Sequence, residues 1–175
     1  MAQFSLAVTA LEHTSSFAKA YAAGMNIPFL DQMQGVAIRG GDAHVRIYRR
    51  TGGRIGGRFF LFGGPDVVLL DHVGAKSGTL RTVPLICLKD GDDLVIVASK
   101  GGYPRHPAWF HNLNANPDTT AQLGGEVRDV TARVASEQER ERLWPRLVDL
   151  YPSFGDYQRR TEREIPVFVL EPVSG

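Results

Sequence analysis

Four consecutive residues, Ser99, Lys100, Gly101 and Gly102, have the residue types expected of an anion-binding loop. They follow an apolar, β-rich run and precede a proline-bounded loop that contains Arg105. Two glycines allow the backbone to turn with its N–H groups pointing outward, while the hydroxyl and the basic side chains add hydrogen bonds and positive charge. The pattern fits a phosphate site, and it equally fits an ordinary glycine turn with solvated basic residues.

A second basic group, made of Lys76, Ser77 and Arg81, follows the apolar run over 67–73. In a small barrel we expect both basic groups to converge on one cleft with an aromatic group. Each charge-assisted hydrogen bond there would contribute roughly 1.5–3 kcal/mol, which favours an acidic, aromatic ligand such as a phosphorylated flavin-like cofactor. The aromatic group consists of Trp109, Tyr151, Phe154 and Tyr157.

Other kinds of catalytic site are not supported. The five histidines never take a two-ligand helix spacing, and the single cysteine, Cys87, cannot build a zinc site, so we expect no metal. Ser77 is misplaced within its glycine frame for a nucleophile elbow, and its turn joins two predicted strands. A net charge of +1 gives no reason to expect a nucleic-acid partner.

The elements that would position these residues begin at about residue 65. Apolar runs bounded by turn residues predict a meander over 67–73, 81–88 and 94–98, a hairpin over 120–123 and 127–134, and a last strand over 165–170. Helices are predicted over 107–115, from Pro107, and over 136–150, where Ser136 and Glu139 form a capping box. The expected fold is α+β: a small barrel of about six mainly antiparallel strands with inserted helices.

Residues 1–64 lack the strand-rich pattern of the remainder and are predicted to form an N-terminal arm, whereas 65–175 are predicted to form the barrel domain. Helices are expected over 12–23, after Pro28 and over 42–50, followed by a basic glycine loop over 51–58. The arm is expected to lie against the barrel, with peripheral membrane contact as the alternative. No run reaches the length of a membrane span and no signal-peptide pattern is present, so the expected compartment is the cytoplasm.

Several motifs occur together in an order that resembles the deazaflavin-dependent nitroreductase family of bacterial oxidoreductases. The resemblance covers about residues 49–172. Its first part comprises Gly74, Lys76, Ser77, Gly78, Arg81, Pro84 and Leu85, then Ser99, Lys100, Gly101, Gly102, His106, Pro107, Trp109, Asn112, Leu113, Ala115, Asn116 and Pro117. Its second part comprises Thr131, Ala132, Trp144, Tyr151, Pro152, Tyr157, Gln158, Thr161, Arg163, Ile165 and Pro166.

The resemblance implies a split β-barrel that binds coenzyme F420, a deazaflavin with a phosphate and a glutamyl tail. It also implies roles for individual residues. The cofactor-binding residues are then Lys76, Ser77, Arg81, Thr82, Ser99, Lys100, Gly101, Gly102 and Trp109. The residues that line the substrate pocket are Ile86, Tyr151, Phe154 and Tyr157, and the proton donors are to be sought among Tyr151, Tyr157 and Ser99.

The implied reaction is hydride transfer from the reduced deazaflavin to a small electron-poor acceptor, a quinone, an enone or a nitroaromatic. Ala75 stands where some members carry an arginine, and Ile86 and Phe154 stand where the nitroimidazole-reducing member has tyrosines. We therefore expect weak nitroimidazole reduction. The alternatives are a flavin mononucleotide oxidoreductase of the same fold and a non-catalytic deazaflavin carrier, and the chain is expected to be a monomer or a homodimer.

Overall fold

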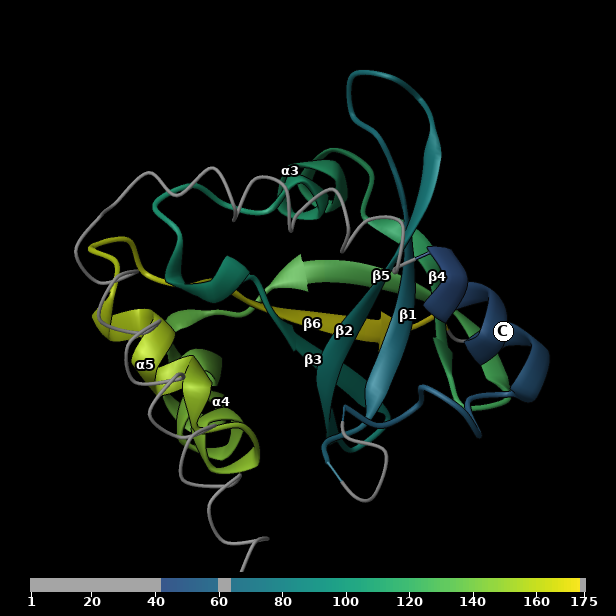
Figure 1. The fold of residues 1–175 in the computed structure, drawn as a ribbon. Coiled ribbons are helices and arrows are strands. Elements are labelled where there is room, and N and C mark those ends of the chain that lie inside the picture. Colours follow the sequence, from purple (N-terminus) through teal and green to yellow (C-terminus); the bar gives the residue numbers. More distant parts are fainter. Residues whose placement is uncertain (1–41, 60–63, 174–175) are drawn as a thin grey trace, which may run out of the picture. The chain divides into compact units, whose positions relative to one another are not determined.

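The computed structural model describes residues 42–59 and 64–173. Its centre is a closed barrel of six strands, in the order β1-β2-β3-β6-β5-β4, in which every neighbouring pair is antiparallel (Figure 1). The α+β barrel predicted from the sequence is therefore confirmed. The strands are β1 (Val67–Val73), β2 (Leu80–Asp90), β3 (Asp93–Val97), β4 (Asp118–Leu123), β5 (Glu126–Val134) and β6 (Val167–Pro172).

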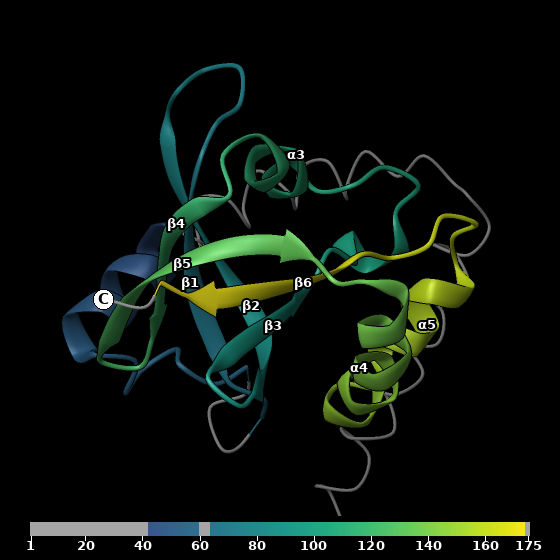
Figure 2. The ribbon, with the colours of Figure 1, turned by 180° about the vertical axis from the view of Figure 1, so that it is seen from behind.

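The helices lie outside the barrel wall or cover its end. A helix over 42–51 lies on one side, α4 and α5 lie on the opposite side, and α3 covers one end, as both ribbon views show (Figures 1 and 2). A single turn, η1, follows β3 directly. The labelled helices are η1 (Lys100–Gly102), α3 (Ala108–Ala115), α4 (Glu137–Leu150) and α5 (Ser153–Arg159).

Strand alternation divides the apolar residues of the barrel wall into an inner and an outer set. Leu94 and Ile96 of β3 point into the barrel core, which α3 completes with Leu113. Val95 and Val97 of the same strand point outward and pack against α4 and α5. Because β3 is buried on both faces, its sequence is a continuous apolar run rather than an alternating one.

The helix over 42–51 is attached to the barrel by one buried tyrosine. The side chain of Tyr48 is fully buried against Val67 and Leu69 of β1. Its hydroxyl donates to Val67 O at 2.7 Å and accepts from Gly124 N at 2.8 Å. The described part of the predicted arm therefore packs on the barrel, while the boundary predicted at residue 64 stays a prediction.

The predicted elements agree with the observed ones except near the carboxyl terminus. The capping box of α4 is confirmed, with Glu139 N donating to Ser136 Oγ and Ser136 N donating to the Glu139 carboxylate. Pro107 is the N-cap of α3 rather than its first residue. The last strand lies two residues later than predicted, and α5 was not predicted, since its seven residues include Gly155 and show no helical periodicity.

Two predictions concern residues that the structure does not cover fully. The helices predicted over 12–23 and after Pro28 lie outside the described residues, as does most of the arm with its proposed membrane contact. Among the described helices, none has the combination of length and apolar character that crossing a membrane requires. The cytoplasmic location stays a prediction.

Replacing Tyr48 with phenylalanine should lower the free energy of unfolding by about 1–3 kcal/mol, because the change leaves a buried carbonyl and a buried N–H without their partner. Urea denaturation followed by circular dichroism measures the difference. Tyr103→Phe is the matched control, since that side chain is 42% exposed and should change stability little. Equal stability of the Tyr48→Phe variant and the unchanged protein would show that the hydroxyl does not fix the helix.

Candidate functional site

The Ser-Lys-Gly-Gly loop forms a left-handed turn immediately after β3. Lys100, Gly101 and Gly102 have φ angles of 46°, 65° and 80°, whereas Ser99 has right-handed angles of −70° and −43°. Gly102 N donates to Ser99 O at 2.9 Å and Tyr103 N donates to Lys100 O at 3.2 Å, which closes the turn. Lys100 is the only non-glycine residue with positive φ in the described part of the chain.

This change from right-handed to left-handed backbone is the geometry of an anion-binding nest, in which successive N–H groups point into one concavity. Within 42–59 and 64–173, no protein group accepts a hydrogen bond from the N–H of Ser99, Lys100 or Gly101. The ammonium group of Lys100 lies 5.1 Å from the centre of the Tyr103 ring and remains exposed. We call residues 99–101 the nest from here on.

The turn that contains the nest touches α5 through Gly102, the residue that follows the nest. A Cβ atom at this position would lie 2.6 Å from Tyr157 O and 3.1 Å from Tyr157 Cα, so only glycine permits the observed approach. The positive φ of Gly102 imposes the same restriction independently. The turn that contains the nest and the α5 backbone at Tyr157 are therefore held at van der Waals distance.

Four residues that the sequence assigned to the substrate pocket are brought together next to this contact. Ile86 of β2, Tyr151, Phe154 and Tyr157 belong to one hydrophobic cluster on the outer face of the barrel. The Tyr151 ring centre lies 5.1 Å from that of Phe154 and 6.4 Å from that of Tyr157. Phe154 is the most buried of the three aromatic residues, with 4% of its surface exposed.

Tyr157 has a strongly perturbed hydroxyl. Burial, followed by a hydrogen bond with Tyr151, raises the pKa of Tyr157 to about 12. The raised pKa keeps the Tyr157 hydroxyl protonated at neutral pH and makes it a poor proton donor.

The second predicted basic group lies apart from the nest. Lys76 and Ser77 occupy the exposed tip of the β1–β2 hairpin, and Arg81 is exposed at the start of β2. Both ribbon views show this tip projecting away from α4 and α5 (Figures 1 and 2). Its base is fixed by Asn112 of α3, whose Oδ1 accepts from Ala75 N at 3.0 Å and whose Nδ2 donates to His72 Nδ1 at 2.9 Å.

Two further residues assigned to cofactor binding are engaged in the protein itself. Thr82 Oγ1 donates to the Asp71 carboxylate and accepts from Arg49 Nη2 at 3.2 Å. Trp109 is 6% exposed and packs inside the barrel, with its ring centre 5.6 Å from that of Phe168. Thus the structure brings together the nest and the aromatic cluster, and it leaves Thr82 and Trp109 in supporting positions.

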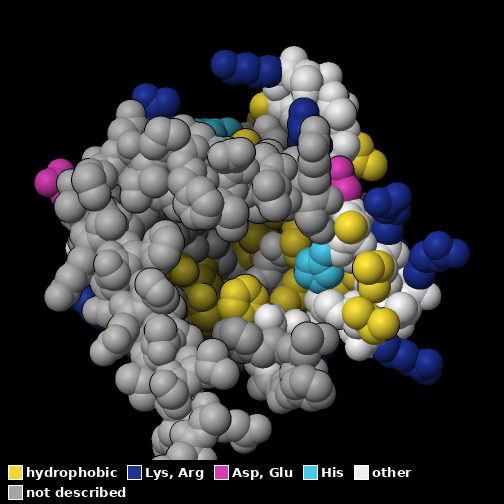
Figure 3. Space-filling view, viewed as in Figure 1, with side chains coloured by type: hydrophobic (Ala, Val, Ile, Leu, Met, Phe, Trp, Pro, Cys, Tyr) yellow, Lys and Arg dark blue, Asp and Glu magenta, His cyan; other side chains and the backbone are white. Residues whose placement is uncertain are grey.

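The sequence did not assign roles to two residues that border the site. Arg163, which was quoted only as part of the family motif, contacts both ends of the loop that contains the nest. Phe59 packs edge-on against Tyr151 with ring centres 5.3 Å apart, and no sequence pattern indicated this contact. Figure 3 shows hydrophobic side chains gathered in the middle of the face that Figure 1 presents, with Lys and Arg side chains around its edge.

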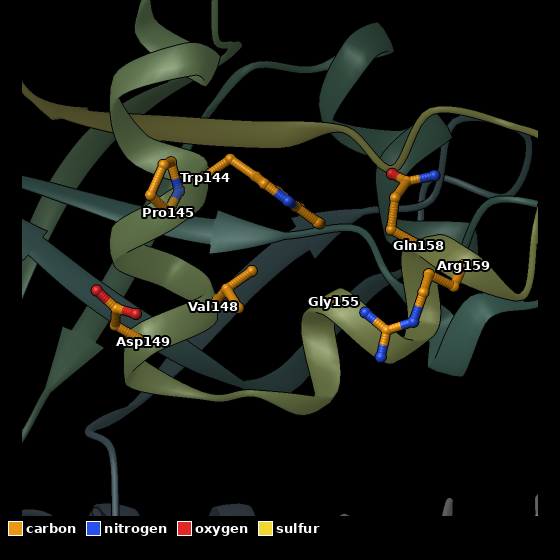
Figure 4. Close-up of a pocket in the computed structure, with 7 residues that line it drawn as sticks. All are labelled: Trp144, Pro145, Val148, Asp149, Gly155, Gln158 and Arg159. Carbon is orange, nitrogen blue, oxygen red and sulfur yellow. The ribbon is translucent and has the colours of Figure 1, made fainter.

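A separate open groove of about 490 Å³ lies between α4 and α5. Trp144 and Val148 face Gln158 and Arg159 across it (Figure 4). None of its lining residues belongs to the predicted site. Within the described ranges, no three His, Cys, Asp or Glu side chains are grouped as a metal ion would need.

Comparison with known proteins decides the family. Residues 42–172 match the family model described as F420H(2)-dependent quinone reductase. The chain belongs to this family. The resemblance noted from the motifs is thereby confirmed at the level of the family, its deazaflavin coenzyme and its class of oxidoreductase.

Individual relatives agree with this assignment. An F420H(2)-dependent quinone reductase of Mycobacterium tuberculosis is 45% identical over 130 residues, which cover 73% of this chain and 86% of the relative. A solved F420-H2 dependent reductase is 45% identical with a TM-score of 0.57, covering 60% of this chain and 93% of its own. A structure described as a domain-swapped dimer is 38% identical with a TM-score of 0.59, covering 79% and 99%.

Gly102→Ala should lower the free energy of unfolding by about 2–4 kcal/mol, since left-handed strain and a clash with Tyr157 O act together. Gly78→Ala is the matched control, because Gly78 has a φ of 64° and open space around its Cβ position. The control should lose only the strain contribution of about 1–2 kcal/mol. Chemical denaturation measures both, and equal losses would show that the contact between η1 and α5 is loose.

Proposed function

We propose that this protein transfers a hydride from reduced coenzyme F420 to a quinone, using the nest to hold the cofactor and the aromatic cluster to receive the acceptor. The observation that carries the proposal is the direct contact between the turn that contains the nest and the helix that carries Phe154 and Tyr157, made at Gly102 and the Tyr157 backbone. Membership of the F420H(2)-dependent quinone reductase family supports the same reaction.

The nest fits the phosphate of the coenzyme. Three backbone N–H groups that find no acceptor among the described residues are the donors that a phosphate oxygen requires, and the ammonium group of Lys100 adds a charge-assisted contact. The Ser99 hydroxyl can add a further hydrogen bond. Ser99, Lys100, Gly101 and Gly102 therefore hold the phosphate in this proposal.

The exposed hairpin tip suits the other end of the coenzyme. Lys76 and Arg81 are exposed basic side chains on a projecting element, with Ser77 between them, and among the described residues they form no ion pair. The carboxylates of a glutamyl tail are anions that exposed basic side chains can bind. We assign Lys76, Ser77 and Arg81 to binding of the tail. We assign Thr82 and Trp109 to supporting the barrel near these residues, through their contacts with Asp71 and Phe168.

The aromatic cluster provides a flat, mainly apolar surface for the reacting rings. Reduced deazaflavin supplies the hydride when it is bound. Quinone reduction by one hydride also consumes one proton, which yields the hydroquinone. Tyr151 and Tyr157 are neighbouring phenols in this cluster, and burial with the proximity of Tyr151 raises the pKa of Tyr157 to about 12, so we assign the proton donor to Tyr151.

The same cluster favours quinones over nitroaromatics. Ile86 and Phe154 contribute stacking surface and no hydroxyl at two positions, so fewer donors are available to an anionic nitro group. A quinone takes up one proton with the hydride, and that proton can also come from solvent after the hydride is transferred. Enones fall between these classes by the same argument.

The proposed function predicts that reduced coenzyme F420 is oxidised by a soluble quinone in the presence of this protein and that the oxidised coenzyme binds more tightly than flavin mononucleotide. The glutamyl tail adds contacts that flavin mononucleotide lacks. Fluorescence titration measures both affinities, and absorbance of the deazaflavin follows turnover. Tighter binding of flavin mononucleotide would support the flavin alternative, and tight deazaflavin binding without turnover of quinones, enones or nitro compounds would support the carrier alternative.

Lys100→Ala should weaken binding of the coenzyme by about 1.5–3 kcal/mol while stability is retained, because one charge-assisted contact is lost and the backbone nest remains. Lys89→Ala is the control, since Lys89 is paired with Asp66 at the far end of β2. A variant that loses thermal stability and keeps its affinity would make Lys100 a structural residue.

Tyr151→Phe should reduce the turnover number for quinone reduction by about 10²-fold, as expected when a positioned acid is removed. Tyr157→Phe should have a smaller effect, because the raised pKa makes Tyr157 a poor proton donor. Steady-state rates at saturating coenzyme compare the two variants. Unchanged rates in both would mean that solvent supplies the proton directly.

A further inference from the structure

Arg163 lies in the connection between α5 and β6 and spans the whole loop that follows β3. Its Nη2 donates to Ala98 O at 3.2 Å and to Ser99 O at 2.9 Å, and its Nε donates to Tyr103 O at 2.9 Å. Its Nη1 donates to His106 Nδ1 at 3.2 Å. One guanidinium group therefore fixes both ends of the turn that contains the nest.

No carboxylate of the described residues neutralises the charge of Arg163. Arg133 and Arg142 are paired with carboxylates, but no Asp or Glu of the described ranges forms an ion pair with Arg163. Burial alone lowers the pKa of Arg163, and the neighbouring His106 has a lowered pKa for the same main reason, burial, with Arg163 next. A partly buried cation that contacts only carbonyl oxygens and an imidazole leaves positive potential at the loop.

The direction of these hydrogen bonds determines where the free N–H groups point. In a trans peptide the C=O and the N–H point in opposite directions. The Ala98 carbonyl shares its peptide with Ser99 N–H, and the Ser99 carbonyl shares its peptide with Lys100 N–H. By binding these two carbonyls on one side, Arg163 turns the corresponding N–H groups of the nest toward the other side and polarises them as donors.

The backbone of Arg163 is itself fixed from α5. Gln158 Nε2 donates to Arg163 O at 2.9 Å, and Gln158 Oε1 accepts from Ile165 N at 2.9 Å. Ile165 is fully buried. The guanidinium group is thus presented to the loop from a rigid support.

We propose that Arg163 is a positioning residue that orients the nest for the coenzyme phosphate through the carbonyls of Ala98 and Ser99 and supplies positive potential from behind it. This inference rests on the proposed function only in naming the coenzyme as the anion that binds. The orientation of the N–H groups can be measured without the coenzyme.

The decisive variant is Arg163→Lys, which keeps the charge but cannot reach from Ala98 to His106 with one ammonium group. We expect the dissociation constant of coenzyme F420 to rise at least 10-fold. The KM for quinone and the turnover number at saturating coenzyme should stay within about threefold, because the aromatic cluster is untouched. Arg159→Lys is the matched control, since Arg159 is exposed on α5 and its ion pair among the described residues is with Asp156.

A second measurement uses backbone amide NMR spectra with inorganic pyrophosphate as the probe. In the unchanged protein, pyrophosphate should shift the amide signals of Ser99, Lys100 and Gly101. In Arg163→Lys these shifts should be reduced, and amide exchange of residues 98–103 should be faster. This pattern supports the inference even when coenzyme F420 fails to bind the unchanged protein, a result that would overturn the proposed function alone.

Two outcomes overturn the inference. The first is an Arg163→Lys variant that binds coenzyme and pyrophosphate as the unchanged protein does. The second is a loss of affinity that disappears when it is corrected for the unfolded fraction measured by denaturation, since Arg163 would then act only on stability. Arg163→Met, which removes the charge as well, should weaken pyrophosphate binding further than Arg163→Lys, and the reverse order also contradicts the proposal.

Discussion

The contact between Gly102 and the backbone of Tyr157 is the constraint on which the candidate site depends. It exists because η1 turns in the left-handed direction, which a side chain at position 102 would prevent. At this point a polar turn meets a helix that carries aromatic residues. The N–H groups of residues 99–101 in this turn find no acceptor among the described residues. Without that approach the turn and the aromatic residues would belong to the same family motif but would lie apart in the structure.

The two faces of the barrel wall carry different clusters: the inner face forms the core, and the outer face carries the aromatic cluster. β3 sends Leu94 and Ile96 into the core and Val95 and Val97 toward α4 and α5, so a single strand serves both sides. The core is completed by α3, and the aromatic cluster is built entirely on the outer face. Under the proposed function, substitutions in the outer cluster can therefore alter acceptor preference without opening a cavity inside the barrel.

Much of this arrangement could be predicted from the sequence, because it depends on local patterns. Apolar runs between glycine turns specify the strands, and Ser136 with Glu139 specifies the start of α4. The nest loop could be identified by its residue types, and the grouping of Ile86 with Tyr151, Phe154 and Tyr157 followed from the family resemblance.

The remainder depends on contacts between distant residues, which local patterns do not encode. Nothing in the sequence indicates that Lys100 adopts positive φ, a conformation that usually requires glycine. The engagement of Thr82 by Asp71 requires the register of β1 and β2, and the reach of Arg163 to Ala98 spans 65 positions in the chain. The short α5 lacks periodicity, so its aromatic residues were predicted without the helix that presents them.

The N–H groups of the nest belong to the main chain, and this has a consequence for how the protein can change. Every residue type except proline brings the same N–H group, so the donors at positions 99–101 are inherited with the fold rather than with particular side chains. Mutation can tune the charge around the turn, but it removes these donors only by introducing proline or by unwinding the turn. Under the proposed function, acceptor specificity can therefore diversify among related chains while the same backbone holds the coenzyme.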